Sequence, residues 1–427
     1  MDGRLSAGQK SSRTYLLAIL TVVVFVCNLD RMIINVLLVP IGREFALNDM
    51  ELGLLAGIAF TALYSVGGIF AGRASEKMDR ISIVAVAVTV WSAMTALGGI
   101  ATSFALLLSA RLGVGLAEAA CQPPSHSLLA DEYAPAERPL ALGFYSVGVY
   151  AGAVVGLPLG GWLAQAYGWR VALCAVGLPG ILIGAILRLT LKDPRVTTKA
   201  SIATSPRSES AVDAIRKILG QREVRHTIAA AVLINAPGSA LLAFFPAVLI
   251  RTHHVTQAQS GLYFGIILGS MTLLGSLLGG WVTSRLARKD VRWTAWVQTV
   301  CQASSCVFGV LCLWSPSLWL ALLCLAPFYF LASSWMGATF TLIQDASAPG
   351  RRATAAALLL LTYNLLGFGL GPLVAGALSD RLRPFVGGDS IRYALMLMLP
   401  LTLWGALHYY LAGKAMAPPL SEPAAAE

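Results

Sequence analysis

Long runs of apolar residues dominate the chain and restrict it to one class of fold. A helix needs roughly 20 mostly apolar residues to cross a bilayer, and the 427-residue sequence contains twelve such runs. Only 12% of its residues are charged, about half the share in water-soluble domains. We therefore predict an all-α membrane protein with twelve transmembrane helices. They cover approximately Tyr15–Pro40, Glu51–Gly72, Ile81–Ala101, Phe104–Ala130, Pro139–Ala166, Trp169–Leu191, Val224–Ile250, Gln257–Ser284, Val291–Leu313, Ser317–Ile343, Ala353–Leu378 and Ile391–Leu411.

The basic residues indicate how these spans are oriented. Of the 31 Lys and Arg, about 23 lie in segments on the same side of the membrane as the N-terminus, about six lie on the other side and two lie within spans. Cytoplasmic segments carry the excess of Lys and Arg, so both termini are predicted to be cytoplasmic. The same rule explains the net charge of +10, and no nucleic-acid partner is expected.

An internal repeat divides the spans into two halves. Asp131–Arg138 after the fourth span resembles Asp345–Arg352 after the tenth, 214 residues later, and the same offset carries Pro158 onto Pro372. Two six-span halves repeated in parallel are similar to the major facilitator arrangement, which binds substrate between the halves near the midplane. We predict the major facilitator fold, with two pseudo-symmetric six-helix bundles at 1–191 and 223–414. Residues 192–222 are expected to form a cytoplasmic linker and 415–427 a disordered tail.

Two cytoplasmic segments carry further predictions. Within the linker, Ala211–Leu219 fits either a short amphipathic helix on the membrane surface or an unstructured tether. The loop Gly72–Arg80 resembles the major facilitator signature for the segment after span two. An acid at such a helix end can pair with the opposite half in one conformation only. We predict a conformational latch; a solvated turn is the alternative. The expected latch residues are Gly72, Glu76, Arg80 and Arg138.

Four ionisable residues lie deep in predicted spans, all in the first half. Asp30 and Arg31 are in span one, and Arg111 and Glu118 are in span four. A charge at mid-membrane costs at least about 2.5 kcal/mol, so such residues normally face the protein interior and serve a function. At ~1.5 Å per residue, both acids come out near the midplane. We predict that Asp30, Glu118 and Arg111 couple proton movement to transport; a static ion network joining spans one and four is the alternative.

Small residues surround Glu118 in span four. Gly113, Gly115, Ala117, Ala119 and Ala120 should let this span pack closely on a neighbour. Other polar groups within spans are candidates for binding substrate, with ordinary structural roles as the alternative. They are His126, Tyr145, Asn235, Tyr363 and Asn364.

Several motifs of the first half together resemble the bacterial branch of the Spinster family. They are Asn28–Arg31, Arg111–Ala119, Pro123–Leu128, Ala130–Asp131, Gly160–Trp162 and Gly168–Arg170. The second half matches only as a generic major facilitator half. The resemblance implies a proton-coupled carrier of amphiphilic lipids such as sphingosine-1-phosphate or lysophospholipids, working in the bacterial inner membrane. It also implies that Asp30 and Glu118 take up protons, with Arg111 beside Glu118, and that Arg31 contacts an anionic head group.

Two alternatives remain beside this prediction. One is a proton-coupled carrier of small organic anions or drugs, because organic-anion and sugar-acid symporters also have an Asp-Arg pair in span one and an Arg…Glu pair in span four. A membrane-embedded enzyme would need a Ser/His, paired Asp or HExxH constellation, which the sequence lacks, so no enzymatic activity is expected. The sequence also indicates no cofactor and no metal. The expected partners are a lipid or amphiphilic substrate, protons and membrane lipids, and the protein is expected to work as a monomer.

Overall fold

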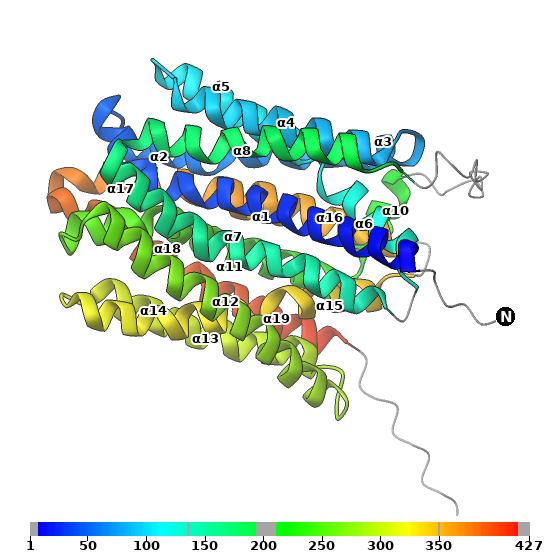
Figure 1. Ribbon diagram of the computed structural model, residues 1–427. Coiled ribbons are helices and arrows are strands. Elements are labelled where there is room, and N and C mark those ends of the chain that lie inside the picture. Colours follow the sequence, from blue (N-terminus) through cyan, green and yellow to red (C-terminus); the bar gives the residue numbers. More distant parts are fainter. Residues whose placement is uncertain (1–6, 135–136, 194–210, 349–350, 417–427) are drawn as a thin grey trace, which may run out of the picture. The chain divides into compact units, whose positions relative to one another are not determined.

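The computed structural model describes residues 7–134, 137–193, 211–348 and 351–416, and these residues are almost entirely helical (Figure 1). Eleven described segments are long and apolar enough to cross a membrane. The predicted all-α membrane fold is therefore confirmed. The first half contains α1 (Ala7–Glu44), α2 (Asp49–Ala56), α3 (Ile58–Lys77), α4 (Arg80–Gly99), α5 (Phe104–Glu118), α6 (Gln122–Glu132), α7 (Arg138–Tyr167) and α8 (Trp169–Thr190).

The second half begins with a short helix and continues through longer ones. It contains α10 (Ala211–Gly220), α11 (Arg222–Thr252), α12 (Gln257–Ala287), α13 (Trp293–Trp314), α14 (Leu318–Ala332), α15 (Trp335–Ala346), α16 (Arg352–Thr362), η2 (Tyr363–Gly369), α17 (Leu370–Val386), η3 (Gly387–Asp389), α18 (Ser390–Met398) and α19 (Pro400–Ala415). The eleventh spanning segment, Thr354–Ala415, has 62 residues. It reverses near η3, where Gly387 has a φ of 61° and α17 packs against α18, so it accounts for two of the twelve predicted spans.

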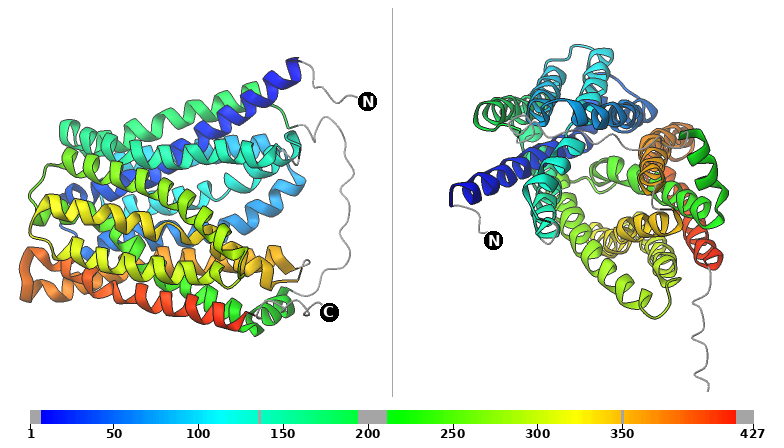
Figure 2. Two further views of the ribbon diagram at one scale, coloured as in Figure 1. Left: turned by 90° about the horizontal axis from the view of Figure 1, so that it is seen from below. Right: turned by 90° about the vertical axis from the view of Figure 1, so that its right-hand side faces the viewer.

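The described residues form two compact units. Unit 1 consists of Met1–Ala203 together with Ala243–Gly269, and unit 2 of Thr204–Leu242 together with Ser270–Glu427. Unit 1 therefore includes the end of α11 and the start of α12. Within unit 1, α1 packs along α7 and α4 along α8 (Figure 2). The predicted bundle limits at 191 and 223 and the cytoplasmic position of the termini stay predictions. Most of the predicted linker (194–210) and tail (417–427) lies outside the described residues.

The helix breaks follow the internal repeat. The 214-residue offset carries both ends of α5, Phe104 and Glu118, onto both ends of α14, Leu318 and Ala332. Each of these helices is followed by a short break and then by a second helix, α6 or α15. The two Pro residues at the start of α6 lack the N–H groups needed to continue α5. The repeat thus extends from the sequence motifs to the interruption of the span itself.

The segment for which the sequence left two alternatives open is a helix. α10 buries Ile218 in one apolar cluster with Val224, Leu342 and Ile343 of unit 2. Just after it, the Gln221 side-chain amide donates a 2.8 Å hydrogen bond to the Ala346 carbonyl. The unstructured tether is therefore wrong for α10, which packs its apolar side against unit 2.

Candidate functional site

A buried ion pair joins α1 to α5 inside unit 1. The Arg31 Nε lies 2.6 Å from the Glu118 Oε2; the Glu118 side chain is 0% exposed and the Arg31 side chain 21% exposed. Glu118 is the last residue of α5, so its carboxylate lies beside the break before α6. A buried ion pair is weak evidence for stability, because desolvating both charges offsets most of their attraction. Its position within two spanning helices points instead to a functional role.

Two aromatic rings of α3 hold the guanidinium of this pair. The Arg31 Cζ lies 4.8 Å from the Phe60 ring centroid and 4.4 Å from that of Tyr64. The two rings stack on each other at 5.3 Å. Each cation–π contact contributes roughly 0.5–2 kcal/mol, more where water is excluded. The aromatic pair therefore fixes Arg31 where it can reach Glu118 and also stabilises the cation if Glu118 becomes neutral.

Close helix packing brings this aromatic pair to the site. A Cβ placed on Gly115 of α5 would lie 2.3 Å from the Phe60 carbonyl oxygen, a distance that no side-chain carbon tolerates. Only glycine at this position lets α3 and α5 approach so closely. The predicted close packing of span four is therefore confirmed, and its neighbour here is α3.

A second group reaches the same oxygen of Glu118. The Cys27 thiol, one helical turn before Arg31, donates a hydrogen bond of 3.4 Å to the Glu118 Oε2. The other carboxylate oxygen, Oε1, is buried and has no hydrogen-bond partner among the described residues. The two oxygens of Glu118 are thus in different environments: Oε2 accepts two hydrogen bonds, and Oε1 remains available for a proton.

Asp30 occupies a separate environment, although it precedes Arg31 in the chain. It is 1% exposed, and its Oδ2 accepts a hydrogen bond of 2.5 Å from the Thr95 hydroxyl of α4. Arg111 of α5 lines a small cavity together with Asp30. The Arg111 Cζ also lies 5.3 Å from the Phe60 ring, so both arginines contact the same aromatic side chain.

The structure shows which arginine forms an ion pair with Glu118. That residue is Arg31. Arg111 lines the cavity with Asp30, and its charge also interacts with that of Glu118. The four predicted residues are gathered in unit 1, and their roles in proton coupling stay predictions.

The predicted substrate-binding residues fall into both units. In unit 1, His126 is exposed and lies edge-to-face on Tyr145, with 5.3 Å between ring centroids. In unit 2, Asn235 donates to the Ala231 carbonyl of its own helix at 2.8 Å. Tyr363, at the start of η2, packs edge-to-face on Trp335 at 5.2 Å.

Of these unit 2 candidates, Asn364 keeps a partly exposed side chain. The hydrogen bond of Asn235 to its own helix gives that residue a structural role in this conformation, whereas Asn364 remains available for a substrate. The substrate-binding role of all five candidates stays a prediction.

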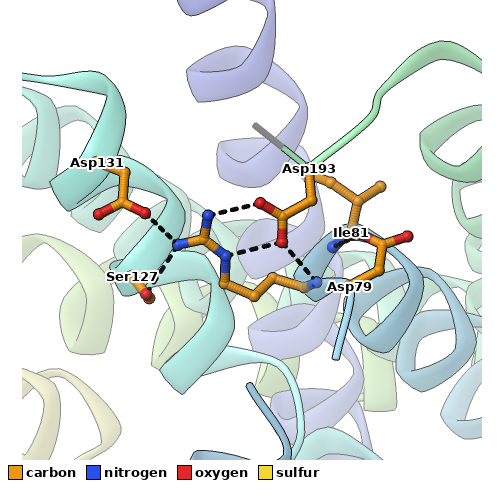
Figure 3. Close-up of polar contacts among 6 residues, drawn as sticks. Asp79, Ile81, Ser127, Asp131 and Asp193 are labelled. Atoms are coloured by element: carbon orange, nitrogen blue, oxygen red, sulfur yellow. Dashed lines mark hydrogen bonds and ion pairs between the residues drawn. The ribbon is translucent and has the colours of Figure 1, made fainter. Parts of the chain in front are cut away.

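Unit 1 contains a second charged network, centred on Arg80 (Figure 3). Its side chain is fully buried. Its guanidinium binds both carboxylate oxygens of Asp193 at 2.6 and 2.9 Å, and it binds Asp131 at 2.6 Å and the Ser127 hydroxyl at 2.9 Å. The Arg80 backbone N–H also donates to Asp193. The network ties the start of α4 to the end of α6 and to the residues after α8.

The other expected latch residues lie outside this network. The Glu76 side chain is exposed, and Arg138 donates to the Tyr133 carbonyl of its own loop at 2.9 Å. A Cβ on Gly72 would meet no heavy atom within 4 Å among the described residues. A latch formed by these residues stays a prediction.

Several residues of both networks were not anticipated from the sequence. Asp193 was assigned to the linker, but it is 2% exposed and belongs to the Arg80 network. Phe60 and Tyr64 were not singled out within their span, although their spacing of four residues places them on one helix face. Cys27 and Thr95 gave no signal, because Cys and Thr are common in membrane-spanning helices.

The sequence is similar to a family of known membrane proteins. A family model described as Major Facilitator Superfamily matches residues 20–372. The chain belongs to this superfamily. A major facilitator efflux pump of Mycolicibacterium smegmatis is 30% identical over 388 residues, covering 90% of this chain and 88% of the relative. The sphingosine-1-phosphate transporter SPNS2 of Xenopus tropicalis is 26% identical over 404 residues, covering 89% of this chain and 78% of the relative.

A solved structure extends the likeness to the whole fold. A bacterial homologue of the human lysosomal transporter Spinster, in an inward-facing and unoccupied conformation, matches with a TM-score of 0.84 and 26% identity. The match covers 95% of this chain and 97% of that protein. The predicted Spinster-type major facilitator is confirmed, as is the prediction of a multi-pass membrane transporter rather than an enzyme.

Proposed function

We propose that this transporter moves an amphiphilic lipid of the sphingosine-1-phosphate or lysophospholipid type, coupled to protons, by alternating access in a bacterial inner membrane. The observation that carries the proposal is the buried Glu118 carboxylate, which holds a partly exposed Arg31 at 2.6 Å. Asp30 lies in a different environment one residue away along α1.

The ion pair suggests how protons and substrate are linked. While Glu118 is ionised, it occupies the Nε of Arg31; when Glu118 takes up a proton at the free Oε1, the ion pair is lost and the guanidinium is released. The Arg31 Nη2 is buried without a hydrogen-bond partner among the described residues. A guanidinium binds the oxygens of phosphate or carboxylate with paired hydrogen bonds. Proton uptake would therefore raise the affinity for an anionic head group.

The polar groups of unit 2 support an amphiphilic substrate. Gln298 is fully buried, but it accepts a 2.8 Å hydrogen bond from Ser334 and donates to Thr283. Thr339 and Tyr409 likewise bond to each other at 2.6 Å. These groups are occupied by neighbouring helices, whereas a carrier of a small polar anion needs several free donors at its site.

A second candidate function is the transport of small organic anions or drugs. The relative described as an efflux pump supports this candidate. The shared cluster of Arg31, Arg111, Asp30 and Glu118 would serve either substrate class, because it recognises only the charge of the head group.

Transport into proteoliposomes distinguishes the two candidates. Purified protein is reconstituted with an imposed pH gradient, and the uptake of labelled lysophospholipid, sphingosine-1-phosphate and a sugar acid is compared. We expect gradient-stimulated movement of one lipid and none of the sugar acid. Sugar-acid movement without lipid movement, in protein shown to be folded, would overturn the lipid proposal in favour of the second candidate.

A further inference from the structure

A small cavity lies beside Asp30 inside unit 1. It measures about 10 Å³, which is about the space that one water molecule requires. The polar side chains around it are Asp30, Thr95 and Arg111, and Gly98, Ala110 and Met94 are among its other lining residues. The cavity thus lies where α1, α4 and α5 bring two opposite charges and one hydroxyl together.

Two buried polar atoms of these lining residues lack partners. The Asp30 Oδ1 and the Arg111 Nε are both buried and have no hydrogen-bond partner among the described residues. Asp30 is 1% exposed and Arg111 6% exposed, so bulk water does not solvate them freely. Leaving such a group without a hydrogen bond is unfavourable, and more so when the group is charged. A ligand that accepts a hydrogen bond from the Arg111 Nε and donates one to the Asp30 Oδ1 would satisfy both atoms.

We propose that the cavity binds a single water molecule that bridges Asp30 and Arg111. The water accepts a hydrogen bond from the Arg111 Nε–H and donates one to the Asp30 Oδ1. Its second hydrogen can reach the Thr95 hydroxyl oxygen, whose own hydrogen is donated to the Asp30 Oδ2. Three polar partners are the usual number for a buried water.

The charges and the size exclude other small ligands. The Arg111 cation disfavours a metal cation, and the Asp30 carboxylate disfavours an anion. A cavity of about 10 Å³ is also too small for a substrate group. Water fits because it carries no net charge and can reverse its hydrogen bonds.

This reversal gives the water a role in proton coupling, a role that rests on the proposed function. A direct Asp30–Arg111 ion pair would hold the carboxyl ionised, but no such pair is present among the described residues. When Asp30 is protonated at Oδ1, the new O–H donates to the water, which keeps one hydrogen bond to the Thr95 hydroxyl. The Asp30 Oδ1 and the Arg111 Nε are then hydrogen-bonded in both protonation states, so a proton can come and go without leaving either atom unpaired.

X-ray footprinting with mass spectrometry tests the water site independently of transport. Ordered water activated in place oxidises the side chains beside it, and Met94 lines the cavity. We expect Met94 oxidation to fall severalfold in Ala110→Val, whose added methyl groups fill the cavity. Ala105→Val, on the exposed side of the same helix, should match the wild type. Equal Met94 oxidation in Ala110→Val and wild type would overturn the proposal.

A gentler variant keeps the test decisive if Ala110→Val does not fold. A Cβ at Gly98 would lie 3.3 Å from Leu107 and 3.9 Å from Ala110, a fit that small shifts can accommodate. Gly98→Ala is expected to lower Met94 oxidation in the same direction.

Transport assays then separate the water site from the proposed function. In proteoliposomes, the filled variant should lose gradient stimulation, while Ala105→Val retains it. Lowered Met94 oxidation with unchanged gradient stimulation would keep the water but refute its role in coupling. If the wild type shows no gradient stimulation at all, the proposed function fails while the footprinting result stands.

Discussion

Neutralising Glu118 should destabilise the protein, and neutralising its partner as well should add little to that loss. In Glu118→Gln, the guanidinium of Arg31 stays mostly buried but loses its counter-charge at 2.6 Å. Removing one member of a buried pair costs about 3–5 kcal/mol. Arg31 is one-fifth exposed and keeps its contacts with Phe60 and Tyr64. We therefore expect the lower end of that range, about 3 kcal/mol.

The double variant measures the interaction energy between Arg31 and Glu118. Arg31→Gln alone leaves the fully buried Glu118 without its cation and should cost about as much. In Arg31→Gln/Glu118→Gln, no charge is left unpaired, so the loss should be smaller than the sum of the single losses by about 2–3 kcal/mol, the upper part of the range measured for coupled pairs. Thermal unfolding of the detergent-solubilised protein reports these differences through its ten Trp residues, none of which is altered. Losses that add to within about 0.5 kcal/mol would refute the pair as an energetic unit.

Three further variants test other contacts of unit 1. Gly115→Ala should lower the unfolding temperature and expression, since its Cβ would lie 2.3 Å from the Phe60 carbonyl; wild-type stability would contradict the close approach. Cys27→Ala removes a hydrogen-bond donor to the Glu118 carboxylate, so gradient-stimulated transport should fall, while Cys27→Ser restores it; an unchanged transport rate in Cys27→Ala would exclude a positioning role. Asp193→Asn weakens a bidentate contact with the buried Arg80. It should cost about 2 kcal/mol or more of stability, measured by thermal unfolding, with Asp213→Asn on α10 as the control.

The fold could be predicted from the sequence because hydropathy and charge act over long segments. The twelve apolar runs correspond to the helices of both units, and the repeat identified from Asp131–Arg138 and Asp345–Arg352 extends to the bounds of α5 and α14. The close helix packing at Gly115 was also predictable, because small residues let two helix backbones approach each other whatever the surrounding side chains.

The pairing of charges could not be predicted, because it depends on how each helix is rotated about its axis. Asp30 and Arg31 are adjacent in sequence, yet consecutive side chains on a helix point in different directions. Asp30 therefore faces Thr95, and Arg31 faces Glu118. The break after Glu118, which ends α5 beside the carboxylate, is equally invisible to a hydropathy pattern. Long-range partners such as Asp193 are 113 residues from Arg80 and give no local signal.

Measuring proton movement, rather than substrate movement, tests most directly whether the Arg31–Glu118 pair couples protons to transport. Proteoliposomes containing a pH-sensitive dye are prepared without a pH gradient, and lysophospholipid or sphingosine-1-phosphate is added on one side. We expect a substrate-dependent change of internal pH with the wild-type protein and none with Glu118→Gln. Substrate movement by the wild type without any pH change, or an undiminished pH change with Glu118→Gln, would contradict proton coupling through the buried Arg31–Glu118 pair.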